Sequence, residues 1–183
     1  MGKHIIVDGP HFWTLGPPGA GKTEFAKRLG PNIWYPVINA DQRMIKAYHV
    51  PNLKVLSDKP YFNQIEGCMA LEIISGLTRP TIVDFGGSII YCPEAIEELE
   101  KRGVFLRLKA PRASIIQKIE DHPERGVDKH GYNTWNELLD SRDIEYDRLG
   151  NFTINIPDGD RNIAADRFGE ELISKHIVRK LKH

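Results

Sequence analysis

A phosphate-binding loop constrains this chain more than any other stretch of its sequence. The segment GPPGAGKT at residues 16–23 matches G-x-x-x-x-G-K-[ST] at every fixed position. A short apolar run precedes it at 11–15, and Phe25 and Leu29 lie on one face of the helix expected to follow. Glycines let backbone N–H groups turn toward phosphate oxygens, and the helix N-terminus adds positive potential. Strand, loop and helix together favour a nucleotide site over a Gly/Pro-rich turn before an ordinary helix.

The residues of this loop have separate expected roles. Lys22 is predicted to reach the β- and γ-phosphates of ATP and to be catalytic, and the Thr23 hydroxyl is predicted to bind Mg²⁺. The residues predicted to contact ATP in this segment are Gly16, Pro17, Pro18, Gly19, Ala20, Gly21, Lys22, Thr23 and Glu24. ATP and Mg²⁺ are therefore the expected ligands.

Short apolar runs alternate with amphipathic stretches along the chain, which is typical of an α/β domain with a parallel sheet. Strands are predicted at 11–15, 33–38, 80–85, 104–109 and 152–156. Helices are predicted near 22–29, 41–48, 62–77, 93–102, 111–120, 134–149 and 162–181. Residues 5–7 either add an edge strand or form a disordered lead. The expected architecture is one three-layer α/β/α domain over 1–183, with a five-stranded parallel sheet.

The composition limits the partners and the location. A formal net charge of zero gives no reason to expect nucleic acid or an anionic membrane as a partner. No apolar run approaches the roughly 20 residues of a membrane span, and the N-terminus lacks a secretory signal. Cys68 and Cys92 make no disulfide framework and suit a reducing compartment, with Cys68 expected in the core. We expect a cytoplasmic monomer that acts on a small molecule.

The length and the number of strand–helix alternations fit a small P-loop kinase of the nucleoside-monophosphate-kinase type. No Asn/Thr-Lys-x-Asp segment typical of GTPases is present, and motor or hexameric ATPases generally need longer chains. Residues 119–132 are charged, have few apolar anchors and are bounded by Pro and Gly. They suit a mobile lid that closes over ATP and brings Arg125 to the transferring phosphate, although a plain solvated loop has the same composition.

Two carboxylates lie at the carboxyl ends of predicted strands, and each has two interpretations. Asp84 ends an apolar run and is expected at the carboxyl edge of the sheet, where open α/β folds bind ligands. It would balance a Mg²⁺ beside Thr23, or it would accept backbone N–H bonds in the following turn. Asp41 would orient a substrate hydroxyl and accept its proton, or it would cap the next helix.

An arginine lies on the apolar face of the helix predicted at 134–149. Arg142 continues the stripe formed by Leu139, Tyr146 and Leu149, so it faces inward where leucine is expected. An inward guanidinium requires an anion, and its planar fork suits a carboxylate or phosphate. Arg142 is therefore predicted to hold an anionic substrate; the alternative is a snorkelling arginine or one paired with an acid such as Asp140 or Asp143.

The chain resembles the shikimate kinase family, small P-loop kinases with a five-stranded parallel sheet and a lid. The resemblance covers about residues 11–172 and rests on LGPPGAGKT, the strand–helix entry ending in Asp41, FNQIE, DFGGS, ERG and SRDIEYDRLGNFTIN. It implies transfer of the ATP γ-phosphate to a hydroxyl of shikimate or a similar carboxylate-bearing acceptor. The site residues that it implies are Asp41 at the substrate hydroxyl, Arg142 at the carboxylate, Gly86 and Gly87 facing the substrate, Arg125 in the lid, and Lys118 and Arg161 near the adenine. The two glycines let backbone N–H groups approach a ligand, or they simply form the turn.

The chain also departs from the pattern of this family. Asn39 replaces a metal-side Asp, Asn63 replaces a second carboxylate-binding Arg, Ser88 replaces a third glycine, and Gly126-Val127 replaces Pro-Leu after the lid Arg. By position, Asn39 is still predicted at the metal site and Asn63 at the substrate site. Losing one guanidinium contact costs about 1.5–3 kcal/mol, roughly 10- to 150-fold in affinity. Asp84 would keep the charge near Mg²⁺ despite Asn39. For the acceptor, the open alternatives are weak binding of shikimate, substitution by another residue, another acceptor such as a sugar acid or nucleoside monophosphate, or a non-catalytic nucleotide-binding protein.

Overall fold

A five-stranded parallel sheet forms the centre of the computed structural model, which describes residues 6–127, 129, 131–156 and 160–181. Its strands are β2 (His11–Leu15), β3 (Val37–Asn39), β4 (Ile82–Asp84), β5 (Gly103–Lys109) and β6 (Phe152–Asn155). They lie in the order β3-β4-β2-β5-β6, with β2 in the middle. In this register Asp84 is the neighbour of Thr14 on one side and of Asn39 on the other.

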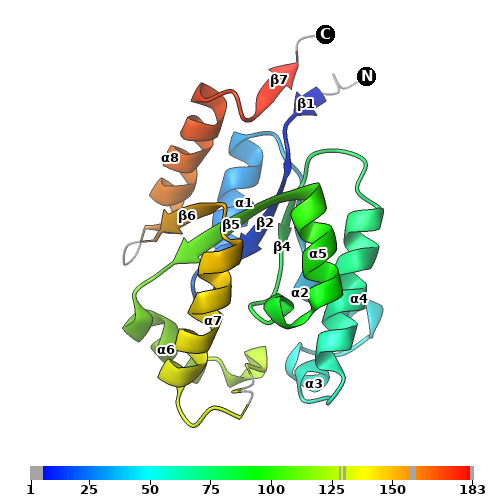
Figure 1. Ribbon diagram of the computed structural model, residues 1–183, viewed down its shortest axis with the longest axis vertical. Coiled ribbons are helices and arrows are strands. Elements are labelled where there is room, and N and C mark those ends of the chain that lie inside the picture. The colour runs from blue at the N-terminus through cyan, green and yellow to red at the C-terminus, as the bar shows by residue number, and fades with distance from the viewer. Residues whose placement is uncertain (1–5, 128, 130, 157–159, 182–183) are drawn as a thin grey trace.

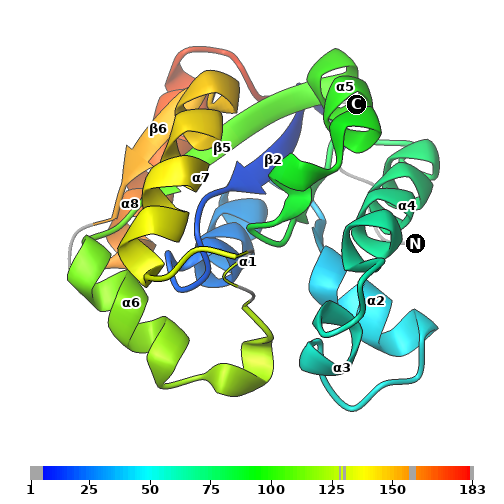
Figure 2. The ribbon, with the colours of Figure 1, turned by 60° about the horizontal axis from the view of Figure 1, so that its bottom comes forward.

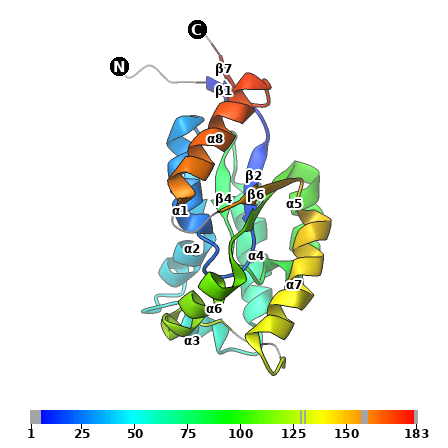
Figure 3. The ribbon, with the colours of Figure 1, turned by 90° about the vertical axis from the view of Figure 1, so that its left-hand side faces the viewer.

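Helices cover both faces of the sheet, as the view along its edge shows (Figure 3). One layer contains α1 (Lys22–Asn32) and α8 (Arg161–Ser174); the other contains α4 (Phe62–Ser75), α5 (Pro93–Arg102) and α7 (Trp135–Leu149). The shorter elements gather near the carboxyl ends of the strands (Figure 1): α2 (Ala40–Ala47), α3 (Lys54–Ser57), η1 (Ile89–Tyr91), α6 (Arg112–Glu120) and η2 (Pro123–Arg125). The predicted three-layer α/β fold is confirmed.

Burial on both faces explains why the central strand carries large apolar side chains on both faces. In β2, Phe12 packs in the cluster beneath α1 and α8, whereas Trp13 packs with α4 and α5 on the opposite face. Both side chains are fully buried. Trp13 also donates a hydrogen bond from Nε1 to the Leu99 carbonyl at 2.9 Å, which satisfies its polar atom and joins β2 to α5.

The largest differences from the sequence-based prediction lie before β3 and after α8. Strand β3 begins at Val37 rather than at residue 33, because α1 continues to Asn32 and Trp34 takes a left-handed backbone conformation with φ of 61°. The last helix ends at Ser174, not near residue 181. The chain then reverses, and β7 (Arg179–Leu181) pairs antiparallel with β1 (Ile6–Asp8) in a separate two-stranded sheet.

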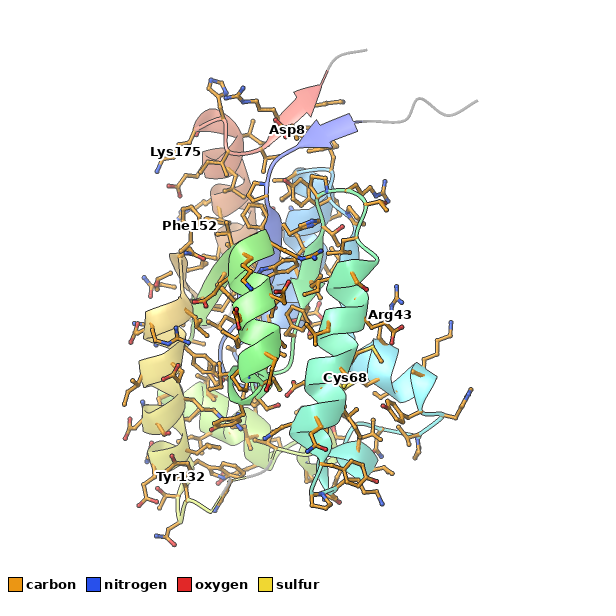
Figure 4. The ribbon with its side chains drawn as sticks, turned by 45° about the vertical axis from the view of Figure 1, so that its right-hand side comes forward. Asp8, Arg43, Cys68, Tyr132, Phe152 and Lys175 are labelled. Atoms are coloured by element: carbon orange, nitrogen blue, oxygen red, sulfur yellow. The ribbon has the colours of Figure 1, made fainter. Side chains whose placement is uncertain are left out.

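Cys68 does not lie in the core, contrary to the prediction. It is exposed on the outer surface of α4, where Figure 4 labels it, whereas Cys92 is buried. The α4 sequence is apolar on almost all sides, so its periodicity does not show which face packs inward. Within the described part of the chain, no helix is long and apolar enough to span a membrane.

Candidate active site

A cavity of about 780 Å³ opens at the carboxyl edge of the sheet, within the range of small-molecule sites. Strand β2 leads into α1 on one face and β4 leads through η1 to α5 on the other, so a crevice forms between their ends. Viewed from this edge, α6 and η2 lie on one side and α2, α3 and α4 on the other (Figure 2). The predicted site residues lining the cavity are Pro18, Gly19, Gly21, Lys22, Thr23, Glu24, Asn39, Asp41, Asn63, Asp84, Gly86, Gly87, Lys118, Arg142 and Arg161.

The phosphate-binding loop curls around the end of β2. Gly16 has φ of 141°, and a Cβ at that position would lie 2.7 Å from the Leu108 carbonyl oxygen, so no other residue fits without a shift of the backbone. Lys22 follows at the start of α1, and its Nζ donates to the carbonyls of Gly16 at 2.8 Å and Pro17 at 3.1 Å. Burial lowers the pKa of Lys22, while the nearby Asp84 and Asp41 carboxylates act in the opposite direction. The ammonium is thus held at the floor of the loop.

Asp84 is the centre of a polar cluster beside this lysine. Its Oδ1 accepts from the Thr14 hydroxyl at 2.7 Å, and its Oδ2 accepts from the Thr23 hydroxyl at 2.6 Å and from Asn39 Nδ2 at 2.7 Å. The residue is only 3% exposed, so these three donors offset much of the cost of burying a carboxylate. Side chains, rather than backbone N–H groups of the following turn, satisfy Asp84. Thr14 was not singled out from the sequence because its position in β2 reads as part of the core.

Asn39, and not Asp41, caps the helix after β3, so the alternative that Asp41 caps this helix is wrong. Asn39 caps α2, because its Oδ1 accepts from the Gln42 N–H at 2.7 Å. Asp41 instead lies in the first turn of α2 and lines the cavity. Its Oδ1 is near Gly86, where an added Cβ would lie 3.3 Å away. The carboxylate is therefore placed where an acceptor molecule could contact it.

Arg142 projects from α7 into the same cavity, although the residue is only 2% exposed. Its Nε donates to the Tyr91 hydroxyl at 3.2 Å, and its guanidinium lies 5.3 Å from the Tyr91 ring centroid. The proposed structural alternatives, Asp140 and Asp143, both pair with Arg112 instead. One turn further along, Tyr146 donates to the Gly87 carbonyl at 2.7 Å and ties α7 to the turn after β4. Tyr91, which orients Arg142, was not identified from the sequence.

Gly86 and Gly87 occupy different environments. A Cβ at Gly86 would collide with Glu66 Oε1, so this backbone closely approaches acidic side chains at the acceptor side. A Cβ at Gly87 would lie 3.0 Å from the Tyr146 hydroxyl and 3.1 Å from the Gly16 carbonyl oxygen. Gly87 thus allows the turn to pack against α7 and the phosphate-binding loop, in addition to lining the cavity.

Glu66 is a further cavity residue that the sequence reasoning missed. It projects from α4, is 2% exposed, and neither carboxyl oxygen has a partner in hydrogen-bond geometry among the described residues. Burial raises the pKa of Glu66 to about 7, the repulsion by Asp41 adds to this rise, and the Ser88 hydroxyl, Arg142 and Lys22 oppose it. Glu66 lies among the inward positions Phe62, Ile65 and Met69, but α4 is apolar on almost all sides, so the sequence does not mark this face as the inward one.

We expect Glu66→Gln to stabilise the protein in alkaline but not in acidic solution. Because the folded-state pKa is raised above the ordinary value of 4.5, the folded state binds more protons, and stability falls as pH rises from about 4.5 through about 7. The loss amounts to roughly 3 kcal/mol above that window. Denaturant unfolding at pH 5 and pH 8 measures it. Glu72→Gln, an exposed position on the same helix, is the matched control, and an equal effect of the two substitutions at pH 8 would contradict the prediction.

The two cations that were predicted to lie near the adenine, Lys118 and Arg161, are close to the loop. A Cβ at Gly21 would lie 2.7 Å from Arg161 Cδ, and a Cβ at Gly19 would lie 3.1 Å from Lys118 Cβ. Lys118 Nζ also donates to the Gly19 carbonyl at 3.4 Å. Ala20, Gly16 and Pro17 support the loop without lining the cavity. The loop is thus covered by side chains from α6 and α8.

The segment predicted as a lid crosses toward the acceptor side. Gly126 follows η2 and approaches Lys54 and Ser57 of α3, so closely that a Cβ there would collide with both. The side chain of Arg125, which was predicted to reach the transferring phosphate, lies outside the described residues, as do residues 128 and 130. The described backbone of the segment reaches from α6 to α3 and borders the cavity.

The fold and the loop define a P-loop protein of the small-kinase type. The sequence profile of the family "Shikimate kinase" matches residues 18–179. The chain belongs to the shikimate kinase family. It is 27% identical over 168 residues to the shikimate kinase of Caldicellulosiruptor bescii, covering 90% of this chain and 94% of that protein. The shikimate kinase of Caldanaerobacter subterraneus is also 27% identical, over 167 residues, with 88% and 93% covered.

A solved structure supports the assignment of the fold. Shikimate kinase from Acinetobacter baumannii, determined in complex with shikimate, superposes with a TM-score of 0.79. The two chains are 20% identical, and the match covers 91% of this chain and 94% of the other. At that level of identity the likeness concerns the arrangement of strands and helices, so the roles of individual side chains depend on the geometry described above.

Proposed function

We propose that this protein transfers the γ-phosphate of ATP to a hydroxyl group of shikimate. The observation that supports this most strongly is the convergence, in one cavity, of the phosphate-binding loop with a carboxylate at Asp41 and a buried cation at Arg142. The loop accounts for the donor nucleotide, and the other two groups match a carboxylate-bearing alcohol. The two cysteines have free thiols, which suits the cytoplasmic location that we propose.

In this proposal some residues bind the two substrates and others align the reacting groups. In this proposal Lys22 and the loop amides hold the phosphates, Asp41 orients the attacking hydroxyl and accepts its proton, and Arg142 anchors the carboxylate. Arg125 of the lid contacts the γ-phosphate, and Lys118 and Arg161 border the adenine. Catalysis then rests on positioning and charge stabilisation, since phosphoryl transfer needs little covalent participation by the protein.

The donor set beside the loop fits Mg²⁺. The Thr23 hydroxyl and the Asp84 carboxylate approach within 2.6 Å of each other, and both are oxygen ligands at the phosphate end of the cavity. Among the described residues no group of three or more His, Cys, Asp or Glu could hold a metal, which matches a cation that relies on phosphates and water for most ligands. Thr23 and Asp84 would hold it, with Asn39 orienting Asp84, and the ion would neutralise phosphate charge. The carboxylate on β4 thereby replaces the one that Asn39 lacks on β3.

Asp84→Asn is expected to raise the Mg²⁺ concentration required for half-maximal activity. Removing the charged ligand weakens the site by about 1.5–3 kcal/mol, which corresponds to roughly 10- to 150-fold. A Mg²⁺ titration at saturating ATP measures this. The control is Asp140→Asn, an exposed carboxylate on α7 that pairs with Arg112. A titration curve that matches the wild type would return Asp84 to a structural role.

Arg142→Lys should weaken acceptor binding more than it lowers kcat. The lysine retains the charge but loses the planar fork and the Nε–H bond to Tyr91, so the KM for the acceptor is expected to rise about tenfold or more. Steady-state kinetics with the acceptor varied at saturating ATP distinguish the two parameters. An unaltered KM would remove Arg142 from acceptor binding.

A panel of acceptors tests the proposed function itself. ADP release is measured with shikimate, gluconate and nucleoside monophosphates, and Asp41→Ala serves as the control for background ATPase activity. Turnover with shikimate alone supports the proposal. Preference for gluconate or a nucleotide would identify another kinase, and ATP binding without turnover of any acceptor would identify a nucleotide-binding protein without this activity.

A further inference from the structure

The acceptor end of the cavity contains two neighbouring side chains on α4 with unsatisfied polar atoms. Glu66 has both carboxyl oxygens buried without a partner in hydrogen-bond geometry, and Asn63 has its Oδ1 in the same condition. Both residues line the cavity. Buried polar atoms of natural proteins are nearly always paired, so unpaired atoms that border a cavity indicate a ligand that completes them. The adjacent backbone of Gly86 approaches Glu66 Oε1 closely and fixes its position.

Few neighbouring groups compensate for the burial of the Glu66 carboxyl group. It forms no ion pair within 4 Å among the described residues, and only the Ser88 hydroxyl lies close to its oxygens, whereas three donors bond to the Asp84 carboxyl group. The side chains that face Glu66 from the packed elements are Lys22 from α1, Asp41 from α2, Ser88 before η1, Cys92 before α5, and Arg142 from α7. Arg142 is thus the cation at the acceptor end of the cavity. It acts on Glu66 electrostatically, but the two side chains form no ion pair.

We propose that Glu66 binds the acceptor as a neutral carboxylic acid, donating a hydrogen bond to the acceptor's carboxylate beside Arg142. This inference rests on the proposed function, because it requires an acceptor with a carboxylate. The protonated carboxyl group takes the place of the second cation that Asn63 does not supply. One oxygen of the acceptor's carboxylate then accepts from the Arg142 guanidinium and another accepts from Glu66 O–H. Both partners are already buried, so the contact needs no further desolvation of the protein.

Binding through a neutral Glu66 links the acceptor to a proton. An ionised Glu66 would repel the incoming carboxylate, so above its pKa of about 7 the site must take up one proton for each acceptor molecule bound. The Kd for shikimate should be nearly constant below pH 6 and should rise about tenfold per pH unit well above pH 7. An acceptor whose carboxylate has been converted to a methyl ester should show no such rise, because it brings no charge.

Glu66→Gln is the decisive variant, because a glutamine amide imitates the size and the donor of the neutral acid. The Kd for shikimate is measured by calorimetry from pH 6 to pH 9, without nucleotide, so that changes at the phosphate-binding loop do not enter. The variant is expected to keep the low-pH affinity of the wild type across the range and to bind about tenfold or more tightly than the wild type near pH 8.5. Calorimetry in two buffers of different ionisation enthalpy should give close to one proton taken up by the wild type at pH 8 and none by Glu66→Gln.

A second variant tests the same idea from the neighbouring position. Asn63→Arg places a cation where it can pair with Glu66, so it should abolish the proton uptake while strengthening binding at high pH. Glu72→Gln on the outer surface of α4 should retain the wild-type pH dependence. The proposal is overturned if Glu66→Gln binds more weakly than the wild type at pH 6, as it would if an ionised Glu66 accepted a hydroxyl of the substrate, or if the variant keeps the wild-type slope. If the wild type neither binds nor phosphorylates shikimate, the proposed function fails first, and this inference fails with it.

Discussion

Lys22→Ala is expected to reduce kcat by about a thousand-fold or more while the protein remains folded. The ammonium lies at the floor of the phosphate-binding loop and is 9% exposed, so it acts on the phosphates at low local dielectric. Alanine leaves the Gly16 and Pro17 carbonyls, which the lysine now satisfies, open to water in the cavity. The loss should therefore fall on transfer of the phosphate rather than on stability.

Single-turnover kinetics with preformed enzyme–acceptor complex measure the effect, and thermal unfolding verifies that the variant is folded. Lys101→Ala is a suitable control, because Lys101 is exposed on α5 and pairs with Glu97 and Glu98 away from the cavity. Turnover of Lys22→Ala within about tenfold of the wild type would mean that the loop does not participate in the chemistry as proposed.

Asp41→Asn should lower kcat by about a hundred- to ten-thousand-fold with a smaller change in acceptor affinity. Asparagine retains the shape and the hydrogen-bonding capacity of the side chain, but it cannot accept the proton of the attacking hydroxyl. The effect should appear in kcat because residue 41 borders the acceptor end beside Gly86, where aspartate in the wild type and asparagine in the variant both help to orient the acceptor.

Varying shikimate at saturating ATP separates the two parameters, with Asp58→Asn as the control. Asp58 is an exposed carboxylate that pairs with Lys54 on α3. A kcat close to that of the wild type, accompanied by a raised KM, would assign Asp41 to binding and would leave proton transfer to another group.

The strongest local signals in the sequence correspond to what was found in the fold. The loop at 16–23 specified its strand, its turn and its helix, because a phosphate cradle needs glycines at fixed intervals. The helix predicted near 134–149 is α7, which begins at Trp135 after a capping box formed by Thr134 and Glu137. Arg142 was recognised as inward from its place in an apolar stripe. These features depend on neighbours within a few residues, so they can be predicted from the sequence alone.

Other parts of the site depend on partners that are distant in the chain. Thr14, Thr23 and Asn39 meet Asp84 only because β2, β3 and β4 are adjacent and in register. Glu66 was missed because α4 is apolar on nearly every side, so its periodicity did not distinguish the buried Glu66 from the exposed Cys68. The reversal at Ser174 likewise depends on β1, which lies at the opposite end of the chain.

The sequence by itself determined the class of this protein: an α/β domain with a nucleotide loop, carboxylates at the carboxyl ends of two strands, and an inward guanidinium at Arg142. The tertiary structure decided which groups surround each charge, and hence that the Asp84 carboxyl group accepts from three donors while burial raises the pKa of Glu66. Charge state in a buried site depends on atoms brought together from separate elements, since desolvation and opposing charges act through space and not along the chain.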